Sequence, residues 1–215
     1  MEAKAPPKVH IRMLLSVLLN LAVFVQTLFS VLSYFQPEGE GTGCFMYFTV
    51  DSNILAAVVC LILAICEIRC WKDGGTVPKW ALLLKFTGTV AVGVTFFTVM
   101  LFLGPSMGYG PMVTGHNLFL HVLNPLAAMF SLAILERKPA MRFAETLWGL
   151  LPTVLYGIVY FYKVIILGPW KGGWFDFYGF KLGGMWYLSA IALPVATWLI
   201  ALGLWGLRKA GKKNK

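Results

Sequence analysis

The chain has 215 residues, of which 59% are hydrophobic and 13% are charged, with a mean hydropathy of +0.75. A soluble domain carries about 25% charged residues, so this composition excludes a water-soluble fold, and its apolar and aromatic content excludes disorder. The formal net charge of +9 would suggest a nucleic-acid partner in a soluble protein, but basic residues in a membrane protein chiefly set its orientation. We therefore expect one integral membrane domain over residues 1–215, with membrane lipids rather than nucleic acid as its surroundings.

Windows of about 19 residues divide the chain into six apolar segments, each long enough for a transmembrane helix, which takes about 20 residues. The first segment is too long for a signal peptide and no small-residue cleavage site follows it, so we expect it to be retained. Only the connection over residues 168–184 is long enough to form a structure of its own. The predicted spans are 12–35, 45–66, 80–103, 116–135, 145–168 and 185–207.

The basic residues indicate the orientation of these spans. An even number of spans places both termini on one side of the membrane. Fourteen of the 18 Lys and Arg residues lie on that side, and only Lys171 and Lys181 lie in connections on the other side. Cytoplasmic segments carry such an excess, so the sequence predicts an all-α protein of six transmembrane helices with both termini in the cytoplasm. On this topology we expect Cys44 to react with a thiol reagent applied from outside.

Polar residues within spans are costly and mark the interior of a bundle or a wet cavity. The second span opens with the sequence YFTVDSN over residues 47–53. Thr49 and Asn53 are four residues apart and share a helix face, whereas Asp51 points about 200° away from Thr49. We therefore leave Asp51 out of the candidate site.

The fourth span carries a second polar stripe, because Asn117, His121 and Asn124 have the spacing i, i+4, i+7. Both spans run from outside to inside, and at 1.5 Å per residue Thr49 and His121 lie about 6–8 Å below the outer boundary. An imidazole beside a hydroxyl can activate it as a nucleophile. The alternatives are that Thr49 bonds a helix carbonyl, that His121 is a packing group, and that Asn124 marks a kink at the following proline.

The fifth span carries Tyr156, Tyr160 and Lys163 at the same spacing. The two tyrosines are either core aromatics or the lining of a pocket. Lys163, and Lys85 in the third span, can extend to an interface and need no function. The connection over residues 168–184 is rich in aromatic residues and glycine, and is either an interfacial anchor or a lid.

Several chemistries have no signature in the chain. Neither H-E-x-x-H nor G-x-S-x-G occurs, and the three histidines do not have the spacing of metal ligands. We therefore predict no metal site and no cofactor.

The six spans, the aromatic-Thr opening of the second span and the His-x-x-Asn-Pro of the fourth resemble the androgen-induced and androgen-dependent transmembrane proteins. These proteins hydrolyse fatty acid esters of hydroxy fatty acids. The chain is most similar to the bacterial six-pass members, through residues 47–53 and the sequence LHVLNP over residues 120–125. The resemblance implies a Thr nucleophile and a His partner, which fall on Thr49 and His121, and a place in the bacterial cytoplasmic membrane.

The leading functional hypothesis is an intramembrane threonine hydrolase that cleaves lipid esters. Thr49 would attack the ester carbonyl and His121 would take and return the proton. The ligand would be a lipid ester or a fatty acyl chain in an apolar cavity. The alternative is a non-enzymatic membrane protein, namely a lipid or small-molecule transporter, a sensor or a structural subunit. The candidates for binding substrate or an oxyanion are Asn53, Asn117, Asn124, Tyr156 and Tyr160.

Overall fold

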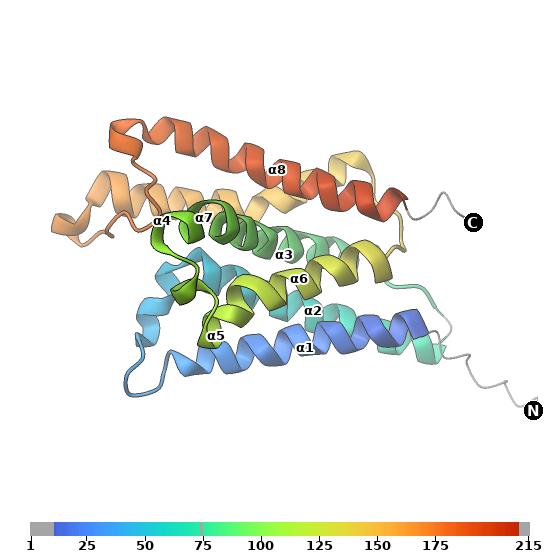
Figure 1. The fold of residues 1–215 in the computed structure, drawn as a ribbon. Helices are drawn as coiled ribbons and strands as arrows, with labels where there is room; N and C mark the ends of the chain where they lie inside the picture. The colour runs from blue at the N-terminus through green and yellow to red at the C-terminus, as the bar shows by residue number, and fades with distance from the viewer. Residues whose placement is uncertain (1–10, 74, 211–215) are drawn as a thin grey trace, which may run out of the picture.

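The computed structural model describes residues 11–73 and 75–210, and the regular structure of these residues is entirely helical. Six of their helices are long and apolar enough to cross a membrane, so the predicted all-α, six-span membrane fold is confirmed (Figure 1). The spans are Ile11–Ser33, Phe48–Asp73, Lys79–Met107, Gly115–Leu135, Phe143–Leu167 and Trp186–Ala210.

The second span shows the largest departure from its expected bounds. It begins at Phe48 rather than at residue 45, and it continues to Asp73 rather than ending at residue 66. The sequence window ends early because Glu67 and Arg69 lower its hydropathy. In the structure the helix continues because Glu67 is only 5% exposed and packs inside the bundle.

The first span, α1 (Ile11–Ser33), begins at the same end of the bundle at which the last span, α8 (Trp186–Ala210), finishes (Figure 1). We call this the terminal end and the opposite end the loop end. The loop end holds the connection over residues 168–185. Of the basic residues that predict the orientation, five lie outside the described residues: Lys4, Lys8, Lys212, Lys213 and Lys215.

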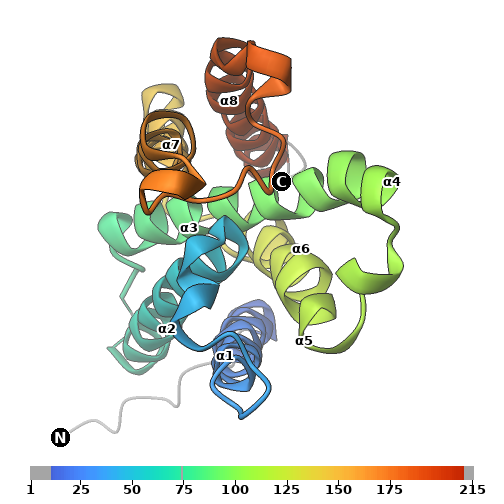
Figure 2. The ribbon, with the colours of Figure 1, turned by 90° about the vertical axis from the view of Figure 1, so that its left-hand side faces the viewer.

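The helix α3 (Lys79–Thr98) lies at the centre of the bundle. In the third span 61% of the apolar stretch is buried, against 17% in the fifth and sixth spans. Figure 2 shows α3 crossing between two groups of helices, with α1, α2 (Phe48–Asp73) and α6 (Asn124–Phe130) on one side and α7 (Leu151–Phe161) and α8 on the other.

Gly88 of α3 allows α2 to approach closely. A Cβ atom at this position would meet Val59 Cγ2 at 2.6 Å and the Cα of Ala56 at 3.2 Å. Small residues at such contacts are typical of transmembrane helix pairs, because lipid provides no hydrophobic force between helices and packing must hold them together.

The described spans contain four π-helical turns, namely Val99–Leu103 in the third, Phe119–Leu123 and Ser131–Leu135 in the fourth, and Tyr162–Leu167 at the end of the fifth. The first turn of the fourth span has a local cause. Pro125 has no N–H to donate to the carbonyl of His121, and its ring crowds that carbonyl. A wider turn relieves the crowding, and π turns of this kind are frequent at functional sites.

Residues 168–184 fold as an ordered loop across the loop end of the bundle. The Asp176 carboxylate accepts hydrogen bonds from the backbone N–H groups of Phe180 and Lys181, both at 2.8 Å. The backbone N–H of Trp174 donates to the Lys163 carbonyl at 3.0 Å. The loop is thereby tied to the end of the fifth span and lies over the start of α2.

Candidate functional site

A cavity of about 1020 Å³ lies between α3, the fourth span, α7 and α8. This volume is at the upper end of the range for small-molecule sites. Its lining along α8 runs from Leu188 to Leu207, about 28 Å at the helical rise, which is close to the thickness of the hydrocarbon core. The cavity lining therefore extends over most of the thickness of the hydrocarbon core, which is more than the length of one acyl chain.

The cavity opens sideways toward the surrounding lipid. Phe102, Phe130 and Leu199 line it, and each of these residues is more than half exposed. They belong to the third, fourth and sixth spans. A ligand could therefore enter from the membrane between these spans without passing through water.

No Asp, Glu, Lys, Arg or His side chain lines this cavity. Its polar groups are hydroxyls only, and they belong to Thr49, Thr95, Thr98, Thr153, Tyr156, Tyr160, Tyr178 and Ser189. A charged ligand group buried there would lack a counterion, which is strongly unfavourable. The cavity therefore suits an uncharged group.

The hydroxyl groups of three tyrosines gather at the loop end of the cavity. Tyr156 donates to the Met46 carbonyl at 2.6 Å, and Tyr160 donates to Asp176 Oδ1 at 3.0 Å. The Tyr160 oxygen also accepts the backbone N–H of Tyr178 at 3.1 Å. Both Tyr156 and Tyr160 line the cavity, so of the two alternatives for these residues the structure supports the pocket lining.

Tyr178 caps the first turn of α2. Its hydroxyl oxygen accepts the backbone N–H of Phe48 at 3.0 Å and lies beside the backbone and side chain of Thr49. The first N–H groups of a helix have no partner within the helix, and here a side chain of the loop supplies one. Burial raises the pKa of Tyr178 to about 12, so the hydroxyl is neutral at physiological pH.

Thr49 lies in the same first turn of α2, and its side chain lines the cavity. A carbonyl oxygen that replaced the Tyr178 hydroxyl would receive the Phe48 N–H within reach of the Thr49 hydroxyl. The positive end of the α2 dipole would favour negative charge on that oxygen. The arrangement can therefore hold the carbonyl of an ester beside a hydroxyl nucleophile.

His121 lies in the first π turn of the fourth span and is 7% exposed. Its Nδ1 is 2.7 Å from the Met112 carbonyl oxygen. A carbonyl only accepts, so Nδ1 carries the proton, and Nε2 of the neutral ring keeps the lone pair that a base needs. His121 is not among the residues that line the cavity, and within the described part of the chain no hydrogen bond joins it to Thr49.

Asn53 connects the two helices that carry Thr49 and His121. Its Nδ2 donates to the Thr49 carbonyl at 2.8 Å and to the Leu120 carbonyl at 2.9 Å. Leu120 directly precedes His121. One amide therefore holds the backbones of the two candidate residues at the same depth, as their positions in the sequence predict.

The other two asparagines of the fourth span face different surroundings. Asn117 donates to the Pro111 carbonyl at 3.0 Å. Asn124 donates to Thr27 Oγ1 at 3.0 Å and to Asn53 Oδ1 at 3.2 Å. The π turn between them rotates the later part of the helix, so the single stripe expected for a regular helix is wrong. Asn53, Asn117 and Asn124 lie away from the cavity lining, with amides bonded to protein acceptors.

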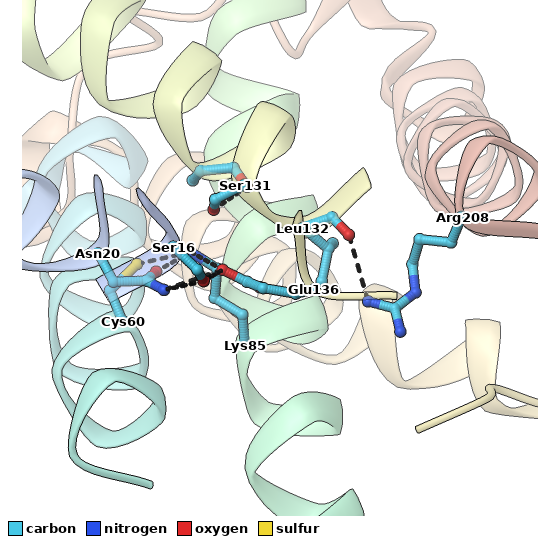
Figure 3. A network of polar contacts seen from close by, with 9 residues as sticks. Ser16, Asn20, Cys60, Lys85, Ser131, Leu132, Glu136 and Arg208 are labelled. Atoms are coloured by element: carbon cyan, nitrogen blue, oxygen red, sulfur yellow. Dashed lines mark hydrogen bonds and ion pairs between the residues drawn. The ribbon is translucent and has the colours of Figure 1, made fainter. Parts of the chain in front are cut away.

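A second polar cluster lies at the terminal end, between α1, α2, α3 and the end of the fourth span (Figure 3). Lys85 is fully buried, and its Nζ donates to Asn20 Oδ1 at 2.5 Å and to Cys60 Sγ at 2.9 Å. Glu136 Oε1 accepts from Asn20 Nδ2 at 2.8 Å and from Ser16 Oγ at 3.1 Å.

The expected extension of Lys85 to the membrane interface is therefore wrong, because its side chain finds acceptors inside the bundle. Sequence reasoning missed the rest of the cluster. The sequence feature that could have revealed the cluster is the presence of single, strongly polar residues in apolar segments, namely Asn20, Glu67 and Lys85.

The described residues contain no group of three or more His, Cys, Asp or Glu side chains that could hold a metal ion. Comparison with protein-family models, with curated proteins and with solved structures finds no match to this chain. Inference about its function therefore rests on the geometry of the cavity and of the polar groups around it.

Proposed function

We propose that this protein is an intramembrane hydrolase that cleaves lipid esters, with Thr49 as the nucleophile. The observation that carries the proposal is that Thr49 lines a cavity of about 1020 Å³ that no charged side chain lines. The substrate class is an ester whose buried part carries no charge, and fatty acid esters of hydroxy fatty acids with an outward-facing carboxylate belong to it. The proposal agrees with the resemblance to the androgen-induced and androgen-dependent family.

In the proposed reaction the substrate carbonyl takes the place of the Tyr178 hydroxyl at the Phe48 N–H. Thr49 Oγ bonds to the carbonyl carbon, and its proton passes to Nε2 of His121, either directly or through one water. The leaving alkoxide takes that proton and departs as an alcohol. Water then hydrolyses the acyl-threonine and returns the fatty acid. The backbone N–H at the start of α2 stabilises the oxyanion in both steps.

The clamp formed by Asn53 supports the role of His121, because it holds the two helices in register. The protein would act in the bacterial cytoplasmic membrane, with the loop end outside and the terminal end in the cytoplasm. Its partners would be the lipid ester and the surrounding membrane lipids.

A second candidate function is binding or transport of the same lipids without chemistry. Two observations favour it. Within the described residues no hydrogen bond joins Thr49 to His121, and the Phe48 N–H at the start of α2 already donates to the Tyr178 hydroxyl. In this alternative Thr49 only contributes a hydrogen bond to the ligand.

The experiment is a comparison of hydrolysis and binding by the protein reconstituted in lipid vesicles. A fluorogenic long-chain ester reports hydrolysis, and a fluorescent non-hydrolysable acyl ether reports occupancy of the cavity. We expect Thr49→Val, which keeps the shape and removes the hydroxyl, to lose hydrolysis at least 100-fold while it still binds the ether. Thr49→Ser should retain part of the activity.

His121→Ala should lose about as much hydrolysis as Thr49→Val, and the double variant should lose little more, because residues that act as a unit are non-additive. Thr98→Val is the matched control, since Thr98 is another threonine that lines the same cavity, and it should hydrolyse the ester normally. Binding of the ether without hydrolysis of any ester by the wild type would instead support the second candidate.

A further inference from the structure

The polar cluster at the terminal end contains more negative groups than its cation can balance. Lys85 supplies one ammonium group, which is 3.9 Å from Glu136 Oε1 and linked to it through Asn20. Glu67 contributes a second carboxyl group, which lies beside Ser16, Asn20, Lys85 and Glu136. The cluster therefore combines one ammonium group with two carboxyl groups inside the bundle.

Ser16 and Asn20 donate hydrogen bonds within the cluster, and they serve one oxygen of Glu136, Oε1, while lying beside Glu67 as well. Glu67 Oε2 is buried and has no hydrogen-bond partner, and the same is true of Glu136 Oε2. Two buried carboxyl oxygens thus lack a donor, although the surrounding hydroxyl, amide and ammonium groups are engaged.

Among residues 11–73 and 75–210, the remaining titratable or charged groups around the cluster do not balance Glu67. On α2, Cys60 Sγ accepts a hydrogen bond from Lys85. On α8, the Arg208 guanidinium donates to the carbonyls of Leu132, at 3.3 Å, and Pro139, at 3.1 Å. In Figure 3 this side chain points at Leu132 rather than toward Ser16 and Asn20.

We infer that Glu67 holds a proton and that the cluster is a proton-binding site built from one carboxylic acid, one carboxylate and one ammonium group. An ionised carboxyl group without a cation is strongly disfavoured in a buried place, whereas a protonated one supplies the donor that the cluster lacks. The ammonium group of Lys85 remains with Glu136. This inference is independent of the proposed hydrolysis, because no residue of the cluster lines the cavity.

The position of Glu67 determines which side of the membrane exchanges this proton. Glu67 is six residues before the end of α2 at Asp73, or about 9 Å along the helix. The nearest water is therefore at the terminal end, which the basic residues assign to the cytoplasm. The site is expected to respond to cytoplasmic rather than external pH.

The test is infrared spectroscopy of the full-length protein in lipid at neutral pH. We expect the wild type minus Glu67→Gln difference spectrum to show the loss of a carboxylic acid C=O band and no loss of carboxylate bands. The band should shift in heavy water, as a protonated carboxyl group requires. Gln resembles the protonated acid in shape and charge, so this variant should fold.

The matched control is Glu38→Gln, because Glu38 is exposed and outside the spans, and it should lose carboxylate bands instead. Lys85→Met removes the only ammonium group of the cluster, so a second carboxylic acid band should appear as Glu136 also takes up a proton. Loss of carboxylate bands in Glu67→Gln would overturn the inference. That result can be read from Glu67→Gln alone, even where Lys85→Met does not fold.

Discussion

At the scale of single residues, the hydroxyl of Tyr178 occupies the position at which the proposed substrate carbonyl would bind. It accepts the Phe48 N–H at 3.0 Å, which is a normal distance for such a bond. A ligand that uses this donor must first displace the tyrosine. The loop residue therefore competes with the ligand and does not simply line its site.

Replacing Tyr178 by Phe tests this competition. The variant frees the Phe48 N–H, so a carbonyl ligand no longer has to break a hydrogen bond worth about 0.5–1.5 kcal/mol. We expect a carbonyl-containing lipid to bind up to about tenfold more tightly, with a small loss of thermal stability. The measurement is a titration with a fluorescent long-chain ketone, and the matched ether should bind unchanged. Weaker binding of the ketone would mean that the Tyr178 hydroxyl holds the ligand directly.

At the scale of elements, the loop over residues 168–184 depends on a close approach at Gly173. A Cβ atom there would meet the Lys163 carbonyl oxygen at 2.1 Å and the Gly168 carbonyl oxygen at 2.6 Å. Only glycine fits, because these contacts are with backbone that cannot move independently. The aromatic loop is held by this turn and by the hydrogen bonds of Asp176, and it carries Tyr178 to α2.

Gly173→Ala is therefore expected to displace the loop while the six spans remain folded. The loop should become sensitive to protease, and a bound lipid probe should dissociate at least several-fold faster. Far-ultraviolet circular dichroism measures the helical content of the spans, and limited proteolysis measures the exposure of the loop. The loss of probe fluorescence over time gives the dissociation rate of the lipid. Gly110→Ala is the control at the same end of the bundle, because its added Cβ would meet nothing within 4 Å. A parallel loss of helical content and probe retention would show that the loop is structural.

At the scale of the whole molecule, the orientation in the membrane remains a prediction from the basic residues. The expected reaction of Cys44 with an external thiol reagent is wrong, because Cys44 is 0% exposed. Labelling of this residue therefore cannot report the orientation. Cys44 is the buried residue of the six-residue 3₁₀ helix Gly41–Met46. A cysteine on the correct side of a membrane still needs exposure in order to react.

Two exposed positions provide a better test. In a variant with Cys66 and Cys70 replaced by Ser, Glu38→Cys at the loop end should react with an impermeant maleimide in intact cells. Lys138→Cys, near the terminal end, should react only after permeabilisation. Both side chains are exposed, so a difference in labelling reports sidedness. The reverse pattern would invert the predicted topology.

The sequence by itself determined the six spans, because a chain in lipid must satisfy its backbone hydrogen bonds within each apolar segment, and segment length and hydropathy are local properties. It also drew attention to Thr49, Tyr156 and Tyr160, which line the cavity, since hydroxyl groups are visible in an apolar run. The tertiary structure alone decided what these residues face. Tyr178 reaches Phe48 across 130 residues of chain and Asn20 reaches Glu136 across 116, and no local period encodes such pairs. For the same reason the burial of Lys85 was invisible: whether a buried charge extends to water or finds a partner depends on which helices pack beside it.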